Sequence, residues 1–294
     1  MSVCSPIKAT FDENDRVIKV DTSEAKSVSR FGTSLLYRWG DYNFHPRAIE
    51  ILSKIQKLIF REDDVILCMF PKSGSTWLSE CIYLIRYNDS NQRRLPRVIS
   101  IFRNPRDVLV SFYHHCKTVK HYDIGFSFDD FFETFMRGQV PCGPIWKMYN
   151  DMFKYHQANP GSTMVVFYED MKQDLRAQLR KVCAFLNCLE PNDERAWAQL
   201  LDHLSVDRMR QNKTINRHDW DKLGLRNSNG FEFVRKGQVN DWKNFFNDEQ
   251  SIRFDREITD KLLPELKCKN VLNFCLSMEI CKCVKNVSLK RREK

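Results

Sequence analysis

Short apolar runs alternate with amphipathic stretches of helical period along this chain. The runs 65–70 and 98–102 have the length and composition of strands buried on both faces. A Pro160-Gly161 turn leads into a third such strand, Met164 to Tyr168. Strands that alternate with helices predict an α/β domain, with a three-layer arrangement of a parallel sheet and helices on both faces.

Local start signals mark several of the predicted helices. Asn104 and Pro105 suit the N-cap and the first position of one helix. Ser127 and Asp130 form a capping box before another. Further helical patterns cover 46–59, 78–85, 145–153, about 171–187 and 193–204, whereas 223–241 is predicted to be a long loop.

No internal repeat or low-complexity linker divides the chain, so we expect one domain over 31–270. A loosely ordered segment, 1–30, precedes it, and a basic tail, 271–294, follows it. The formal net charge of +9 favours an anionic partner, which could be a nucleotide, a sulfated or phosphorylated ligand, nucleic acid or a membrane surface.

Two features bear on the compartment. The acidic start argues against a secretory signal, and no apolar run is long enough to span a membrane. Eleven cysteines without a CxxC pair predict reduced thiols, and therefore a cytoplasmic location.

The junction 70–77 (FPKSGSTW) joins the first predicted strand to a helix. A helix N-terminus offers unpaired N–H groups and the positive end of the helix dipole. Gly74 lets the backbone approach an anion closely, and Lys72 adds a charge. Further donors are the hydroxyl groups of Ser73, Ser75 and Thr76. We interpret this junction as a phosphate or sulfate cradle, with a plain strand–helix turn as the alternative. It is not the ATP-binding P-loop, because Lys72 precedes the only glycine.

Two other segments offer cations. Arg103 ends the second strand, directly before the cap at Asn104. Ser111 lies about two helical turns beyond that cap and shares its face, so Arg103 and Ser111 can converge on one anion. In the polar loop, 235–237 (RKG) supplies two cations and a flexible glycine. Each of these segments alone could equally be structural or solvated surface.

Together the segments resemble the cytosolic sulfotransferase family. That family has sequences like YPKSGTTW and RNPKDVxVSxYH, and this chain has FPKSGSTW at 70–77 and RNPRDVLVSFYH at 103–114. FYEDM at 167–171 and RKGxxxDWK at 235–243 also match, in the family's order. The resemblance implies a P-loop-NTPase-like sulfotransferase fold. It also implies transfer of a sulfuryl group from 3′-phosphoadenosine-5′-phosphosulfate (PAPS) to a hydroxyl or amine of a small acceptor.

The resemblance also implies roles for individual residues. Lys72 to Thr76 would hold the 5′-phosphosulfate, and Lys72 would neutralise charge on the bridging oxygen as its bond to sulfur breaks. Trp77 would stack on adenine, Tyr168 would contact its edge, and Arg103, Ser111, Arg235, Lys236 and Gly237 would hold the 3′-phosphate. Ser205 and Met209 match family positions beside the nucleotide, and their neighbours Leu204 and Val206 depart from the family pattern. Neither a metal nor nucleic acid is implied.

The match fails where the family carries its catalytic base. In the family, a strand ending in Lys-Thr-His lies between the first two motifs, whereas 78–102 here contains no histidine. Several tens of residues and one expected strand are therefore missing. Three explanations remain: a skipped exon or faulty gene model, an inactive nucleotide binder, or a substitute base among His114, His115 and His121.

The family's dimer motif is altered as well. It should start at Lys243, but Asn247, Asp248 and Ile252 occupy its key places, so a family-type homodimer is not expected. The remaining partner is a small-molecule acceptor. The competing function is a regulatory isoform that binds the nucleotide without transfer, and a P-loop kinase is disfavoured by the position of Lys72.

Overall fold

The computed structural model describes most of residues 58–268 and five short strands before them. The described ranges are 9–11, 17–20, 28–31, 34–39, 42–44, 58–61, 64–86, 97–120, 122, 124–227 and 231–268. Most of the predicted helix at 46–59 and the whole predicted tail at 271–294 lie outside these ranges. Among the described helices, none is long and apolar enough to cross a lipid bilayer.

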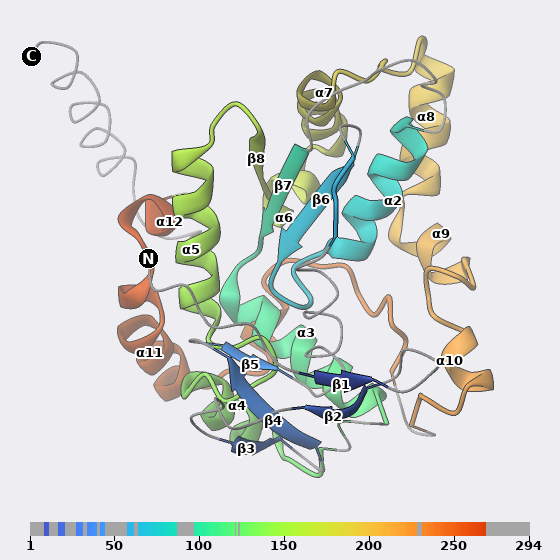
Figure 1. Cartoon of the computed structure of the whole chain (residues 1–294). Helices are drawn as coiled ribbons and strands as arrows, with labels where there is room; N and C mark the ends of the chain where they lie inside the picture. The colour runs from blue at the N-terminus through green and yellow to red at the C-terminus, as the bar shows by residue number, and fades with distance from the viewer. Residues whose placement is uncertain are drawn as a thin grey trace, which may run out of the picture.

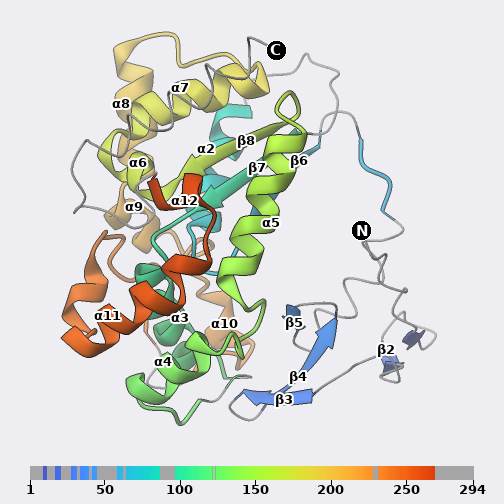
Figure 2. The ribbon, with the colours of Figure 1, turned by 90° about the vertical axis from the view of Figure 1, so that its left-hand side faces the viewer.

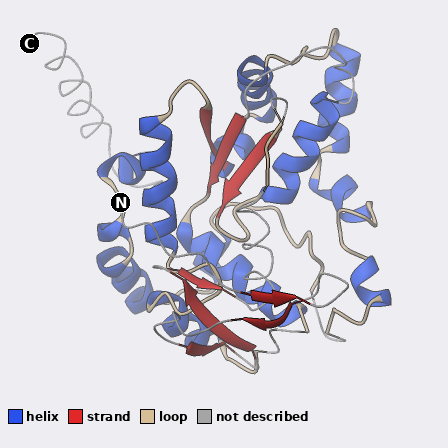
Figure 3. Ribbon diagram, in the orientation of Figure 1, coloured by secondary structure: helices blue, strands red, loops and turns tan. Residues whose placement is uncertain are grey.

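Three parallel strands form the centre of the molecule (Figure 3). They are β6 (Val65–Met69), β7 (Arg97–Phe102) and β8 (Thr163–Phe167). β7 lies in the middle, with Val65 of β6 opposite Arg97 and Thr163 of β8 opposite Val98. The predicted parallel sheet is confirmed, and β6 and β7 pair directly with no strand between them.

Helices cover both faces of this sheet (Figures 1 and 2). One layer contains α5 (Ile145–Ala158), and the other contains α2 (Ser75–Arg86), α7 (Leu175–Leu186) and α8 (Glu194–His203). α3 (Pro105–Thr118) and α4 (Phe128–Met136) lie below the sheet in Figure 1, beyond the ends toward which the strands point, and their apolar side chains join the core of the first layer. Phe102 and Phe167 belong to the apolar core of the first layer, whereas Ile99, Ile101 and Val166 belong to the core of the second. Because side chains alternate along a strand, β7 and β8 contribute to both cores. The three-layer prediction is confirmed.

The local start signals act as the sequence predicts. The Asn104 side chain accepts a hydrogen bond from the N–H of Arg106 and caps α3. Ser127 and Asp130 form the capping box of α4. The helix predicted at about 171–187 is instead divided at Asp174, because this carboxylate caps α7 by accepting from the N–H of Ala177.

The remaining elements are short. They are α6 (Tyr168–Gln173), α9 (Val206–Gln211), α10 (Asp219–Lys222), η1 (Asp241–Asn244), α11 (Asp248–Glu257), η2 (Thr259–Lys261) and α12 (Pro264–Cys268). Most of the loop predicted at 223–241 is irregular, as expected.

β6 differs from its prediction as a strand buried on both faces. All five of its residues are partly exposed, whereas β7 is buried from Val98 onward. The reason is position in the sheet. Among the described residues, β6 pairs only with β7 and lies at an edge, so one side of it lacks the cover that the middle strand has.

Five N-terminal strands form two small antiparallel sheets away from the central one (Figure 1). β1 (Ala9–Phe11) pairs with β2 (Val17–Val20), and β4 (Ser34–Trp39) lies between β3 (Val28–Phe31) and β5 (Tyr42–Phe44). Phe31 packs edge-on against Phe126 and Phe131, which joins β3 to the layer of α4. The structure thus places strands within 1–30, the segment for which the sequence predicted little order.

Candidate functional site

The loop between β6 and α2 turns sharply at two residues. Lys72 has φ +70° and Gly74 has φ +114°, both in the left-handed half of conformational space. A Cβ on Gly74 would lie 2.8 Å from Cδ2 of Tyr168, so only glycine fits there. The turn delivers the chain into α2, whose first N–H groups have no intrahelical partners and point toward the loop.

Ser73 faces away from this opening. Its side chain is fully buried, with its hydroxyl 3.1 Å from the hydroxyl of Tyr149, and its N–H donates to the carbonyl of Phe70. It is therefore not among the residues that line the adjoining pocket, although the sequence resemblance implied a phosphate contact.

Arg103 connects all three predicted motifs. Its guanidinium donates to the carbonyl of Lys72 at 3.2 Å and to the carbonyl of Gln238 at 3.0 Å. It also lies over the ring of Tyr168, 4.3 Å from the centroid. Only its Nε atom lacks a hydrogen-bond partner. The buried cation thus holds two loops against the end of β7: the first loop, 70–74, and the third loop, which carries Arg235 to Gln238.

Two acidic side chains hold the third loop: Asp107 fixes it to α3, and Asp241 braces it from within. Asp107 accepts hydrogen bonds from the N–H groups of Asn240 (2.7 Å) and Trp242 (3.0 Å). Asp241, which is 4% exposed, accepts from Arg235 at 2.5 Å and from Lys236 at 2.8 Å. These contacts set the direction in which both cations leave the loop.

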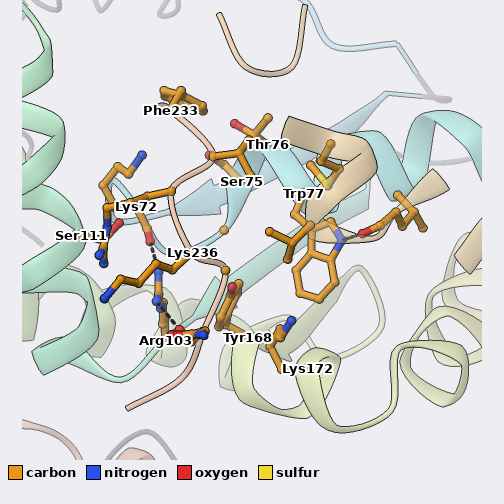
Figure 4. A pocket seen from close by; sticks show the side chains of 18 residues that line it. Lys72, Ser75, Thr76, Trp77, Arg103, Ser111, Tyr168, Lys172, Phe233 and Lys236 are labelled. Atoms are coloured by element: carbon orange, nitrogen blue, oxygen red, sulfur yellow. Dashed lines mark hydrogen bonds between the residues drawn. The ribbon is translucent and has the colours of Figure 1, made fainter. Parts of the chain in front are cut away.

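The three segments surround one pocket of about 130 Å³ (Figure 4). Its lining includes Lys72, Gly74, Ser75, Thr76, Trp77, Arg103, Ser111, Tyr168, Met209, Arg235, Lys236 and Gly237. Figure 4 shows the cationic side chains of Lys72, Arg103 and Lys236 on one side and the indole of Trp77 on the other. Of the residues that the sequence placed around a nucleotide, only Ser73 and Ser205 are outside the lining.

Ser205 has a structural position beside the pocket. It is the N-cap of α9, and its hydroxyl accepts from the N–H of Arg208 at 3.3 Å. The residues on either side of it do line the pocket: the carbonyl of Leu204 accepts from the indole of Trp77 at 3.0 Å, and Val206 packs against Gly237. The two departures from the family pattern therefore lie at the pocket wall.

Some lining residues were not expected from the sequence. They are Lys172, Phe233, Val234 and Gln238. Lys172 lies four residues after Tyr168 on α6, so helical spacing could have indicated it. Phe233 could not have been found this way, because it lies in an irregular loop. Its ring centroid is 4.1 Å from Nζ of Lys72.

Burial and neighbouring charges shift several pKa values in the site. Burial, and then the cations of Arg103 and Arg235, lower the pKa of Lys72 to about 7. Burial alone would raise the pKa of Asp241, but hydrogen bonds from Lys236 and Arg235 outweigh it and lower the pKa to about 2. Asp241 is therefore ionised at neutral pH and balances one of the two loop cations.

Two histidines lie near Lys72. His114 and His115 line a small cavity beside the main pocket, and Lys72 and Ser111 line both. Burial, followed by the charge of Arg235, lowers the pKa of His114 to about 4, so its imidazole is neutral at pH 7. Neither of its ring nitrogens has a hydrogen-bond partner. His121 lies outside the described residues.

Comparison with known proteins identifies the family. The profile of the Sulfotransferase domain family matches residues 90–265, a range that includes Arg103 and Gly237 and begins after the Lys72 loop. The chain is 26% identical over 286 positions to human sulfotransferase 1C2, covering 79% of this chain and 93% of that protein. It is 28% identical over 262 positions to amine sulfotransferase of Oryctolagus cuniculus, covering 73% of this chain and 85% of that protein.

Solved structures share the fold. A retinol dehydratase in complex with androsterone and the inactive cofactor PAP has a TM-score of 0.71 and 17% identity, covering 92% of this chain and 99% of its own. Mouse sulfotransferase SULT7A1, complexed with PAP, has a TM-score of 0.64 and 23% identity, covering 87% of this chain and 99% of its own. The profile match over residues 90–265, together with the layered fold, leads to one conclusion: this chain belongs to the Sulfotransferase domain family.

Proposed function

We propose that this protein binds PAPS and transfers its sulfuryl group to a hydroxyl or amine of a small acceptor. One observation carries the proposal: cations from three distant segments line the same pocket, opposite an aromatic wall. Such a pocket suits a nucleotide with an anionic group at each end. The PAP molecules bound in the two similar structures support this choice of nucleotide.

The pocket fits the two ends of the nucleotide differently. The N-terminus of α2, with Ser75 and Thr76, would hold the 5′ end, because unpaired N–H groups and the helix dipole favour an anion. Trp77 and Tyr168 would flank the adenine. The 3′-phosphate would be held by Arg103, Ser111, Arg235, Lys236 and Gly237. Asp241 would leave these cations with a net positive charge for that phosphate.

Transfer requires in-line attack of the acceptor oxygen or nitrogen on sulfur, with cleavage of the bond to the 5′-phosphate oxygen. PAP leaves, and the acceptor proton must pass to a base. Lys72 would stabilise charge on the departing oxygen. A pKa of about 7 leaves this lysine only partly protonated without the nucleotide, and nearby phosphate charge would restore its protonated form.

The segment that would carry the base is absent from this chain. No histidine lies within 78–102, and the alignment with human sulfotransferase 1C2 runs over 286 positions while covering only 79% of this chain. This supports a missing stretch of several tens of residues. His114 is a poor substitute because it is buried among rings, with Phe231 4.6 Å and Phe245 5.2 Å from its own centroid. A protein that binds the nucleotide without transfer is therefore the second candidate function.

Two measurements separate these outcomes. Calorimetric titration with PAP should give a single binding site, and absence of binding would refute both functions. Radiolabelled PAPS with a panel of phenols, alcohols, steroids and amines then tests transfer. Labelled product supports the enzyme, whereas PAP binding without product supports the second candidate. ATP that binds more tightly than PAP would instead indicate a kinase.

A further inference from the structure

The hydroxyl of Tyr149 lies between two phosphate-binding segments without touching the pocket. α5 carries this residue across the sheet to the point where β6 and β7 end, and its side chain is fully buried. Its oxygen lies 3.1 Å from the hydroxyl of Ser73 and 3.2 Å from the backbone nitrogen of Arg103. It donates to the carbonyl of Arg103 at 2.9 Å.

These contacts use the full hydrogen-bonding capacity of a phenol. A tyrosine hydroxyl has one hydrogen and two lone pairs. The hydrogen goes to the carbonyl of Arg103, and the lone pairs accept from the N–H of Arg103 and the hydroxyl of Ser73. Because a buried polar group without a partner is costly, the three groups hold one another in a single arrangement.

We propose that Tyr149 is a positioning residue that fixes the spacing between the 5′ and 3′ phosphate sites. The inference rests on the proposed function, because it takes both sites to be occupied by one nucleotide. It also assigns a role to Ser73, whose hydroxyl anchors the first loop to Tyr149 instead of contacting a phosphate.

The physical reason is the gain from binding two linked groups. A ligand with two anchored ends binds more tightly than either half, provided that the sites are held at the span of the ligand. Without the tie, the hydrogen bond from the Arg103 guanidinium to the carbonyl of Lys72 still joins the 71–74 loop to Arg103, but the backbone of Arg103 is no longer anchored to that loop through Ser73, so the spacing varies more. Each site can still bind a single phosphate, but the advantage of the linked ligand falls.

The test compares Tyr149→Phe with wild type by calorimetry, using PAP, adenosine 5′-phosphate and adenosine 3′-phosphate. The monophosphates are measured by competition against PAP. Loss of the hydroxyl should weaken PAP binding about tenfold, while the affinity for each monophosphate should stay within about twofold of the wild-type value. Tyr155→Phe, on the half-exposed face of the same helix, is the matched control and should leave all three affinities unchanged.

Ser73→Ala separates the two readings of that serine. If Ser73 acts through Tyr149, Ser73→Ala weakens PAP binding and leaves the affinity for adenosine 5′-phosphate unchanged. The double variant with Tyr149→Phe then binds PAP only slightly more weakly than Tyr149→Phe alone. A selective loss of adenosine 5′-phosphate binding would mean that Ser73 contacts the phosphate directly, and would contradict the proposal.

Two further outcomes would overturn the assignment of Tyr149. Monophosphate affinities that fall in parallel with PAP would mean that it supports one site and not the spacing. A lower melting temperature with unchanged affinities, measured well below that temperature, would mean a purely structural role. Absence of PAP binding by the wild type would refute the proposed function itself, which keeps the two failures distinguishable.

Discussion

Arg103→Ala is the substitution that most directly tests the architecture of the site. Arg103 is 7% exposed, and its guanidinium donates to the carbonyls of Lys72 and Gln238, so it joins loops that are far apart in sequence. It also lies 4.3 Å from the ring centroid of Tyr168. Alanine would remove a phosphate ligand and, at the same time, the group that holds both loops in place.

The expected loss follows from the kinds of contact removed. A hydrogen bond from a charged donor contributes about 1.5–3 kcal/mol, and a partly desolvated cation–π contact about 0.5–2 kcal/mol. Because these terms are not additive, we expect PAP binding to weaken by about 2–4 kcal/mol. That corresponds to an increase in Kd of about thirtyfold to about a thousandfold, which calorimetry at 25 °C can measure.

Arg137→Ala is a suitable control, because this arginine is 67% exposed and lies outside the pocket lining. Arg103→Lys should recover only part of the affinity, since one ammonium cannot reproduce the planar fork that reaches two carbonyls. An Arg103→Ala protein that melts like wild type and binds PAP within twofold of it would refute the placement of the 3′-phosphate.

Three other predictions concern the loops. Gly74→Ala should weaken PAP binding at least tenfold and destabilise the fold by about 1–3 kcal/mol in thermal unfolding, because φ is +114° and the new Cβ would lie 2.8 Å from Tyr168. The control Gly161→Ala places its Cβ in open space and should change neither quantity. Lys72→Met should be more stable than wild type in urea unfolding at pH 6, because burial of the ammonium lowers the pKa of Lys72 from 10.5 to about 7. This gain in stability should shrink as the pH rises from 7 to 10, and a constant gain would contradict the reasoning. Asp241→Asn should lower the free energy of unfolding by about 1–3 kcal/mol at pH 7, because it leaves two cations uncompensated. This loss of stability should shrink as the pH falls from about 4 to about 2, and a loss that stays unchanged over that range would mean that Asp241 is neutral in the folded protein.

The interior elements follow closely from local sequence. The strands at 97–102 and 163–167 and the helix from Pro105 are where the pattern predicts them. Apolar runs and N-cap side chains act over a few residues, and those forces are the same in any fold. The division of the 171–187 helix at Asp174 shows the limit, because both segments share the helical pattern and only the cap separates them.

The sequence predicted the site as separate segments, and the structure brings all of the predicted nucleotide-binding residues except Ser73 and Ser205 to the lining of one pocket. Ser73 is the instructive exception. Its motif places it among phosphate ligands, but its hydroxyl is turned toward Tyr149 on a helix more than seventy residues later in the chain. The sequence could not indicate this, because the direction of a loop side chain depends on which distant group offers a partner.

By itself, the sequence determined the α/β class, the residues that carry charge and the order of the motifs, because periodicity and side-chain chemistry are local properties. Only the tertiary structure decided that Arg103 ties the Lys72 loop to Gln238, that Asp241 balances Arg235 and Lys236, and that β6 is an edge strand of the described central sheet. These are contacts between groups far apart along the chain. They exist only after folding has removed those groups from water and left each buried charge or donor to find its partner.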